Sequence, residues 1–314
     1  MTILKIIGII LITLVILIII IKFVLSYIMF NYCFKGITQK KNKKYDDIYE
    51  KKLPSLKEYK EEVLKKPFER LEITSSRNHK LYAYYLKQQP NNKKLIIMSH
   101  GWLGDAFRDS FYFGPFYFNH QDFDILLVAH EGHYPSEGKY IGFSIYDGEN
   151  LKKWIDYINK ITDNNYQIYL HGVSMGASSV LRALNYDLPN VKGVIADCGF
   201  SSGYEELCFV SKYKYHTPSF YTVPYIRRII LHRMHYDIKE QTIDINKKNN
   251  IPVLFIHGAL DDFVPCKMSE KNYERYNGPK KIIIFPNAKH ASSYRKNKEE
   301  YEKLVMDFIE NCQN

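Results

Sequence analysis

The residues best suited to chemistry in this sequence lie in the short run Gly172-Val173-Ser174-Met175-Gly176. The run follows a stretch typical of a strand, residues 167–170, and precedes a helical pattern. A serine between two glycines at a strand-to-helix turn suits a nucleophile held on a sharp, strained bend, because small neighbours let the backbone pass closely. The pattern therefore predicts that Ser174 attacks a carbonyl carbon and forms an acyl-enzyme.

A serine hydroxyl is a weak nucleophile, so it needs a base to take its proton and a carboxylate to orient that base. In one known order along the chain the serine comes first, the acid second and the histidine last. His290 follows the last predicted strand and is the predicted base, and Asp261 follows the strand before it and is the predicted acid. Two alternative acids remain, Asp262 beside it and Asp197 at the end of the strand after the nucleophile helix.

The tetrahedral intermediate of acyl transfer also needs hydrogen-bond donors for its oxyanion. The backbone N–H of Met175, directly after the nucleophile, is one predicted donor. The second predicted donor is the backbone N–H of Trp102, in the turn His100-Gly101-Trp102 that follows an early strand. Both donors belong to the main chain, so the side chains alone do not identify this role.

Strands and helices must alternate to bring these residues together, and after Phe68 they do. Several of the strand-like stretches are continuous apolar runs, as in strands buried on both faces. The alternation predicts a mostly parallel sheet of eight strands with helices on both faces, whose ligand lies beyond the carboxyl ends of the strands. The predicted strands are 71–74, 81–86, 95–98, 124–129, 167–170, 191–196, 252–256 and 281–285, and the predicted helices are 106–120, 145–160, 175–184, 268–276 and 297–312.

The stretch 200–250 is too long for a simple connection between two core strands. It is rich in aromatic residues and contains helical pieces. We expect it to form a small helical cap over the site. Its aromatic side chains would line an apolar acyl pocket, pack the cap onto the sheet, or do both.

The apolar sequence of residues 1–32 predicts a transmembrane anchor. No residue from Ile6 to Ile21 is charged, and a helix of about 20 apolar residues crosses the hydrocarbon core of a bilayer. A cleaved signal peptide is the alternative, which the length of the run and the lack of a small-residue cleavage site disfavour. Six lysines follow the apolar run and only Lys5 precedes it, so the positive-inside rule predicts a single-pass protein of the cell membrane with a cytoplasmic catalytic domain.

Residues 33–67 predict a charged linker and an amphipathic helix over 54–66 that packs on its own domain rather than on a membrane surface. Residues 68–314 then form one domain, into which the cap at 200–250 is inserted. We expect deletion of residues 1–35 to leave a soluble and active domain.

Residues from about Phe68 to the C-terminus resemble the α/β-hydrolase superfamily through a set of motifs. More narrowly, they resemble membrane-anchored bacterial hydrolases of the serine aminopeptidase-like and BEM46-like branch. The resemblance implies a serine hydrolase that needs no cofactor, and it leaves the substrate open because the fold hosts many chemistries. One loop, residues 130–136, departs from the Arg-Gly-His-Gly pattern that is usual at this place in the family. The motifs are His100-Gly101-Trp102, Gly132-His133, Ser136-Glu137-Gly138, the Ser174 turn, Asp197-Cys198-Gly199-Phe200, His257 to Pro265, and Ala288-Lys289-His290.

The leading hypothesis is hydrolysis of an ester or thioester in a small-molecule or lipid-like acyl substrate. A membrane-anchored serine peptidase of aminopeptidase type is the alternative, ranked second because the sequence shows no anchor for a substrate terminus. A third hypothesis is a catalytically inactive, membrane-tethered binding protein on the same fold. The presence of serine, aspartate and histidine together argues against it.

Charge and composition exclude several other classes of function. The formal net charge is +10, but residues 1–66 hold 13 Lys against 6 acidic residues, so the excess lies beside the anchor and suits an anionic lipid surface rather than nucleic acid. Two groups of histidines, His130-Glu131 with His133 and His232 with His235 and Asp237, lack convincing further ligands for a metal. The five cysteines are widely spaced and fit neither a disulfide framework nor a zinc site.

Overall fold

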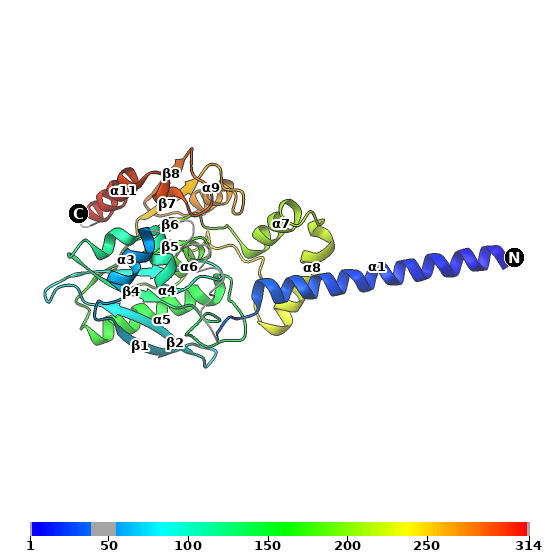
Figure 1. The fold of residues 1–314 in the computed structure, drawn as a ribbon, viewed down its shortest axis with the longest axis horizontal. Helices are drawn as coiled ribbons and strands as arrows, with labels where there is room; N and C mark the ends of the chain where they lie inside the picture. Colours follow the sequence, from blue (N-terminus) through cyan, green and yellow to red (C-terminus); the bar gives the residue numbers. More distant parts are fainter. Residues whose placement is uncertain (1, 39–54, 313–314) are drawn as a thin grey trace.

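The computed structural model describes residues 2–38 and 55–312 and contains an eight-stranded sheet in the order β1-β2-β4-β3-β5-β6-β7-β8 (Figure 1). The pairs β1–β2 and β2–β4 are antiparallel, and all other neighbours are parallel. The predicted α/β-hydrolase sheet is therefore confirmed. The strands are β1 Glu69–Thr74, β2 Lys80–Leu86, β3 Lys94–Ser99, β4 Phe123–Val128, β5 Gln167–Val173, β6 Val191–Asp197, β7 Val253–Gly258 and β8 Lys280–Phe285.

Helices cover both faces of the sheet because successive side chains of a strand point to opposite faces. Ile96 and its equivalents in other strands pack with α4 and α11 on one face, whereas Leu95 and its equivalents pack with α5 and α6 on the other. These layers form two large apolar cores. The helices around the sheet are α4 Ala106–Phe113, α5 Ile145–Ile161, α6 Met175–Ala183, α9 Cys266–Arg275, α10 Ser293–Lys296 and α11 Lys298–Asn311.

The predicted helix over 106–120 is wrong in its second half. α4 ends at Phe113, and Pro115–Phe118 forms a short 3-10 helix, η1. Proline has no N–H to donate and disfavours a helical conformation in the residue before it, so Gly114 caps the helix and does not continue it. A Cβ at Gly114 would lie 2.5 Å from Cε of Met98, so a larger residue here would have to displace the end of that side chain.

The amphipathic helix predicted before β1 is α3, Ser55–Val63. Val63 is buried, and Tyr59 Oη donates a hydrogen bond to the carbonyl of Pro115 at 2.6 Å. Lys66 Nζ donates to the carbonyl of Phe118 at 3.3 Å. The helix therefore packs on its own domain, as its pattern favoured. Residues 39–54, which hold most of the predicted charged linker, lie outside the described residues.

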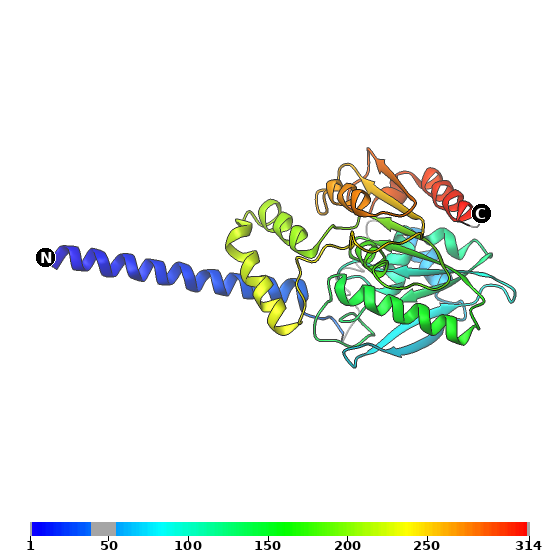
Figure 2. The same ribbon diagram turned by 180° about the vertical axis from the view of Figure 1, so that it is seen from behind.

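The N-terminal helix α1 runs from Thr2 to Phe34 and is long and apolar enough to cross a membrane, although a signal sequence can have the same properties. Its first turns extend far from the sheet, and its last turns lie beside a pair of helices (Figure 1 and Figure 2). These are α7, Gly203–Tyr213, and α8, Ser219–Arg233, which connect β6 to β7. They form the predicted helical cap, so the cap and α1 are neighbours.

The last turns of α1 belong to the packed domain, so the predicted start of a linker at residue 33 is not what the structure shows. Phe30 and Phe34 are fully buried, in one apolar cluster with residues of the cap. Beyond the helix, Gly36 N–H donates to the carbonyl of Lys139 at 2.9 Å, and Ile37 N–H donates to Gly132 at 2.7 Å. Deletion of residues 1–35 would remove part of this core, so the expectation of a separable active domain does not fit the packing.

Candidate active site

Ser174 occupies the turn between β5 and α6 with φ 55° and ψ −121°, a conformation that L-residues rarely adopt. The glycines on either side make the turn feasible. A Cβ at Gly172 would lie 2.2 Å from the carbonyl oxygen of Gly176, and a Cβ at Gly176 would lie 2.1 Å from that of Ser99. The serine is 9% exposed, so its hydroxyl faces a largely enclosed space.

His290 bridges Ser174 and Asp261, although the three residues are far apart in the sequence. Its Nε2 lies 3.0 Å from Oγ of Ser174, and its Nδ1 lies 2.7 Å from Oδ2 of Asp261. With the proton on Nδ1 donated to the carboxylate, Nε2 can accept the serine proton. The structure thus brings together the predicted nucleophile, base and acid, each in a loop after the carboxyl end of β5, β8 or β7.

The carboxylate of Asp261 is held from several sides. Its Oδ1 accepts hydrogen bonds from the N–H groups of Phe263 and Val264, each at 2.9 Å. Burial opposes ionisation, but the interactions with His290 and His257 outweigh it and hold the pKa of Asp261 well below its usual range. Asp261 is therefore an ionised partner that can stabilise a positive charge on His290.

The two alternative acids lie elsewhere. Asp197 accepts hydrogen bonds from Ser293 Oγ at 3.2 Å and Tyr301 Oη at 3.1 Å, while its backbone carbonyl accepts the N–H of Ser174 at 2.8 Å. Burial raises the pKa of Asp197 to about 6. Asp262 lines the cavity in front of Ser174, but His290 is hydrogen-bonded to the adjacent Asp261 and not to Asp262.

Trp102 and Met175, the predicted oxyanion donors, both line the cavity in front of Ser174. Met175 is the first residue of α6, where a backbone N–H has no acceptor within the helix. The loop of Trp102 is fixed by Asp109 of α4, whose Oδ2 accepts the N–H of Gly101 at 2.7 Å. The residue before Asp109 is Arg108, whose Nη2 donates a hydrogen bond to the carbonyl of Leu103 at 2.8 Å. These contacts hold the loop against the serine.

Sequence reasoning missed Arg108 and Asp109. A signal was present, because two adjacent charged residues interrupt an otherwise aromatic helix and both are buried. It also missed Glu206 of α7, which is buried and lines the same cavity as Ser174. Neither carboxylate oxygen of Glu206 has a hydrogen-bond partner among the described residues. No spacing rule in the sequence distinguishes Glu206 from its neighbour Glu205.

The cavity has a volume of about 430 Å³ and is enclosed mainly by aromatic and aliphatic side chains. Four parts of the chain build it: the last turns of α1, the helix α4, the cap helix α7 with the residues after it, and the loops of the sheet. Such a space suits an acyl chain or another apolar group next to a small number of polar atoms. Its apolar lining residues are Tyr32, Cys33, Trp102, Tyr112, Phe143, Val173, Met175, Phe200, Leu207, Val210, Tyr215, Phe263, Val264 and Ala291.

The first group of histidines considered as metal ligands, His130 and His133, makes other contacts. His130 Nε2 hydrogen-bonds Ser99 Oγ at 2.8 Å, and the ring of His133 packs 4.7 Å from that of His100. The carboxylate between them, Glu131, forms an ion pair with Arg77 at 2.8 Å. None of these three side chains lines the cavity in front of Ser174.

One group at the site has atoms close enough for a metal: those of Cys198, Asp261 and His290 lie within 4.8 Å of one another. The donor set fits a metal poorly. Burial, with the negative charges of Asp197 and Asp261, raises the pKa of the Cys198 thiol well above its usual range, whereas a metal ligand must be the thiolate. The other two side chains, Asp261 and His290, are already hydrogen-bonded to each other.

Comparison of the sequence with known proteins places the site within a family. Residues 146–314, which contain the serine turn and both loops of the hydrogen-bonded chain, match the model of the prolyl oligopeptidase family. The uncharacterized protein YqkD of Bacillus subtilis is 30% identical over 253 residues, covering 78% of this chain and 81% of YqkD. YfhR of Escherichia coli K12 is 23% identical over 192 residues, covering 60% of this chain and 61% of YfhR.

Solved structures show the same fold. The esterase Pf2001 of Pyrococcus furiosus aligns with a TM-score of 0.64 at 19% identity, over 80% of this chain and 93% of that one. The acylaminoacyl peptidase of Pyrococcus horikoshii aligns with a TM-score of 0.55 at 17% identity, over 79% of this chain and 42% of the peptidase. Identities this low establish the α/β-hydrolase fold alone. Together with the family match, they lead to one conclusion: the chain is a hydrolase that belongs to the prolyl oligopeptidase family.

Proposed function

We propose that the protein hydrolyses an ester or thioester through an acyl-enzyme on Ser174. The observation that carries the proposal is the hydrogen-bonded chain from Ser174 through His290 to Asp261, which begins at the wall of a mainly apolar cavity. A nucleophile, a base and an orienting carboxylate in contact are the arrangement that acyl transfer requires.

In this mechanism the Oγ of Ser174 attacks the acyl carbonyl carbon while Nε2 of His290 takes the hydroxyl proton. The N–H groups of Met175 and Trp102 stabilise the oxyanion. The intermediate collapses when His290 returns the proton to the leaving alcohol or thiol, which leaves the acyl group on the serine. Water then enters, His290 takes its proton, and the same steps release the carboxylic acid and regenerate the serine.

The substrate in this proposal is a small-molecule or lipid-like acyl compound, because the cavity lining is mainly apolar. The long apolar helix α1 supports a single-pass anchor in the cell membrane. The lysines that follow it favour a cytoplasmic catalytic domain.

A peptidase is the second candidate, and Glu206 is the observation that favours it. A carboxyl group without a partner in the cavity is suited to hydrogen-bond the amino terminus of a peptide. The family name and the acylaminoacyl peptidase likeness agree with such a substrate. The hydrolysis rates of an ester and of the amide with the same acyl group, measured side by side, would distinguish an esterase from a peptidase.

Covalent labelling by a fluorophosphonate probe tests the proposed nucleophile. We expect the full chain in detergent to be labelled, Ser174→Ala to lose all label, and His290→Ala to lose nearly all of it. Asp262→Asn is compared with Asp261→Asn to identify the acid. Label that persists in a folded Ser174→Ala variant would refute the mechanism. A folded wild type that takes no label would instead favour the inactive, membrane-tethered binding protein.

A further inference from the structure

The cap lies directly against the apolar helix α1. Tyr221 Oη, near the start of α8, donates a hydrogen bond to the carbonyl of Ile18 at 2.6 Å. The rings of Phe23 and Tyr225 meet edge to face at 4.5 Å. One helical turn further along, the fully buried Ser26 packs against α8. The beginning of α8 therefore lies beside the Ile18–Phe23 part of α1.

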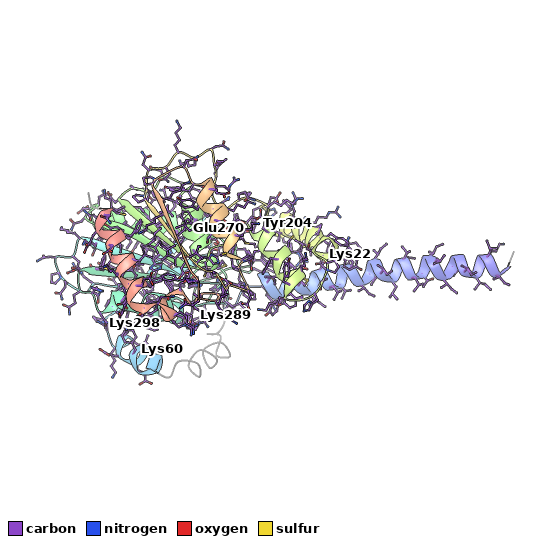
Figure 3. All side chains as sticks on the ribbon, turned by 90° about the horizontal axis from the view of Figure 1, so that it is seen from above. Lys22, Lys60, Tyr204, Glu270, Lys289 and Lys298 are labelled. Carbon is purple, nitrogen blue, oxygen red and sulfur yellow. The ribbon has the colours of Figure 1, made fainter. Side chains whose placement is uncertain are left out.

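This part of α1 contains the first charged residue after Lys5. Lys22 closes the uncharged run, and about 20 residues of helix span the hydrocarbon core, so a membrane-spanning α1 places Lys22 near the boundary of that core. Ile18 lies four residues earlier, which is about 6 Å deeper at 1.5 Å per residue. The Lys22 ammonium group is 5.7 Å from the centre of the Tyr221 ring. Figure 3 shows Lys22 at the outer edge of the cap, where α1 becomes free of other elements.

The tip of the cap, residues 213–221, has the composition of a membrane interface. Phe220 is 78% exposed, and Tyr213 and Tyr215 are exposed as well. Two lysines, Lys212 and Lys214, adjoin these rings. Exposed aromatic rings with lysines nearby are enriched at the level of lipid headgroups, where the rings are partly buried and the ammonium groups stay in water.

The catalytic cavity reaches the surface beside the cap tip. Tyr32 of α1 and Tyr215 of the cap tip both line the cavity, yet they are 52% and 44% exposed, and their rings are 6.5 Å apart. The reactive Ser174 lies at the inner end, where little solvent reaches it. An entering chain would pass between α1 and the cap tip.

We propose that the cap tip is a second membrane contact, and that the passage between Tyr32 and Tyr215 admits the acyl chain of a membrane lipid ester directly from the bilayer. This inference rests on the proposed ester hydrolysis and on a membrane-spanning α1. The apolar passage keeps the chain out of water between the bilayer and the serine, so a substrate already in the membrane avoids the cost of crossing the aqueous phase.

The depth of the cap tip can be measured directly. The full-length variant Phe220→Trp is reconstituted in phosphatidylcholine vesicles with brominated acyl chains, which quench tryptophan on contact. The control is Ile161→Trp, an exposed position at the end of α5, before the amino end of β5 and so at the opposite edge of the sheet. After subtraction of wild-type emission, we expect strong quenching and a blue shift for Phe220→Trp only. Equal quenching of both variants would overturn the proposal.

A functional arm uses Phe220→Glu, because Phe220 is outside the cavity and the hydrogen-bonded chain. We expect at least a tenfold lower rate on a long-chain lipid ester in vesicles and an unchanged rate on a short, water-soluble ester. Equal rates of wild type and variant on the vesicle substrate would overturn the membrane route. A wild type that hydrolyses neither ester and takes no fluorophosphonate label would refute the proposed function instead, while the quenching experiment would still decide whether the cap tip meets the bilayer.

Discussion

The indole Nε1 of Trp102 donates a hydrogen bond to the backbone carbonyl of Cys33 at 2.8 Å. This bond joins the loop that carries a proposed oxyanion donor to the last turn of α1. The position of the loop therefore depends on the N-terminal helix as well as on the sheet.

Replacing Trp102 by Phe keeps an aromatic ring but removes the donor together with part of the indole. A single hydrogen bond contributes about 0.5–1.5 kcal/mol, so we expect kcat/KM on a short ester to fall about twofold to tenfold, with the protein still folded. Circular dichroism checks the fold. An unchanged kcat/KM would mean that the loop is positioned by Arg108 and Asp109 alone.

Truncation should distinguish a simple anchor from a structural helix. Removal of residues 1–22 leaves Phe30 and Phe34 in their buried sites, and we expect this protein to bind fluorophosphonate in mild detergent. Removal of residues 1–35 deletes both side chains and one wall of the cavity, so we expect aggregation or loss of label. Equal labelling of the two truncated proteins would show that the last turns of α1 are dispensable.

Asp261→Asn keeps the size of the side chain but removes the charge that holds His290. In a serine triad this change lowers kcat by about 10³–10⁴-fold, and we expect a similar loss here. Because the pKa of Asp261 is depressed in the fold, its contribution to stability is present above its usual pKa of about 4 and is lost as the pH falls further. Steady-state kinetics on Asp197→Asn provide the comparison. If kcat falls by this factor in Asp197→Asn and not in Asp261→Asn, then Asp197 is the acid.

Asp197 should make the protein less stable as the pH rises. Burial raises its pKa to about 6, so between pH 4 and pH 6 the folded state keeps a proton that the unfolded state has lost. This favours folding at low pH, and the advantage, about 3 kcal/mol at most, is lost as the pH rises through 6. Asp197→Asn should flatten the unfolding free energy over this window in urea titrations. Asp147, with a pKa raised by burial to about 7, and Glu206, whose pKa burial also raises, should leave a residual slope in this variant.

Glu206 should trade stability for substrate recognition. Burial and the negative charge of Asp261 raise its pKa well above the usual range, so the cavity holds a neutral carboxyl group that has no hydrogen-bond partner among the described residues. Glu206→Leu should raise the unfolding free energy by about 1–3 kcal/mol and lower kcat/KM on substrates that carry an amine or hydroxyl near the scissile bond. The control is Glu205→Gln, which removes an ion pair with Lys271 and alters the hydrogen bonds from Ser201 and Gln241, all outside the cavity lining. A less stable Glu206→Leu protein with unaltered substrate preference would contradict this role.

The sheet could be predicted because each strand is a short apolar run bounded by polar loops. Parallel strands place their carboxyl ends at one edge, so the loops after β5, β7 and β8 had to meet. The glycine-flanked turn then pointed to Ser174, and the positions of the two later loops pointed to His290 and to an aspartate after β7. The choice between Asp261 and Asp262 depended on loop shape, which the sequence indicates only by analogy.

The rest depends on contacts between distant segments. The apolar character of Phe30 and Phe34 suits lipid and protein equally, so no pattern reveals that α1 ends inside the catalytic domain. Glu206 is one of two adjacent glutamates at the start of a helix, which is a favourable place for acidic residues in general. Only the packing of the cap distinguishes the buried Glu206 from the half-buried Glu205.

The junction between α1 and the domain has a consequence for how the molecule can move. Gly36 and Ile37 are hydrogen-bonded to the loop of Gly132 and Lys139, so no flexible tether separates the helix from the site. With α1 in a bilayer, Ser174 is held at a fixed height and cannot search the aqueous space around its anchor, as an enzyme on a long linker could. The area that one molecule can serve is then set by its lateral diffusion in the membrane.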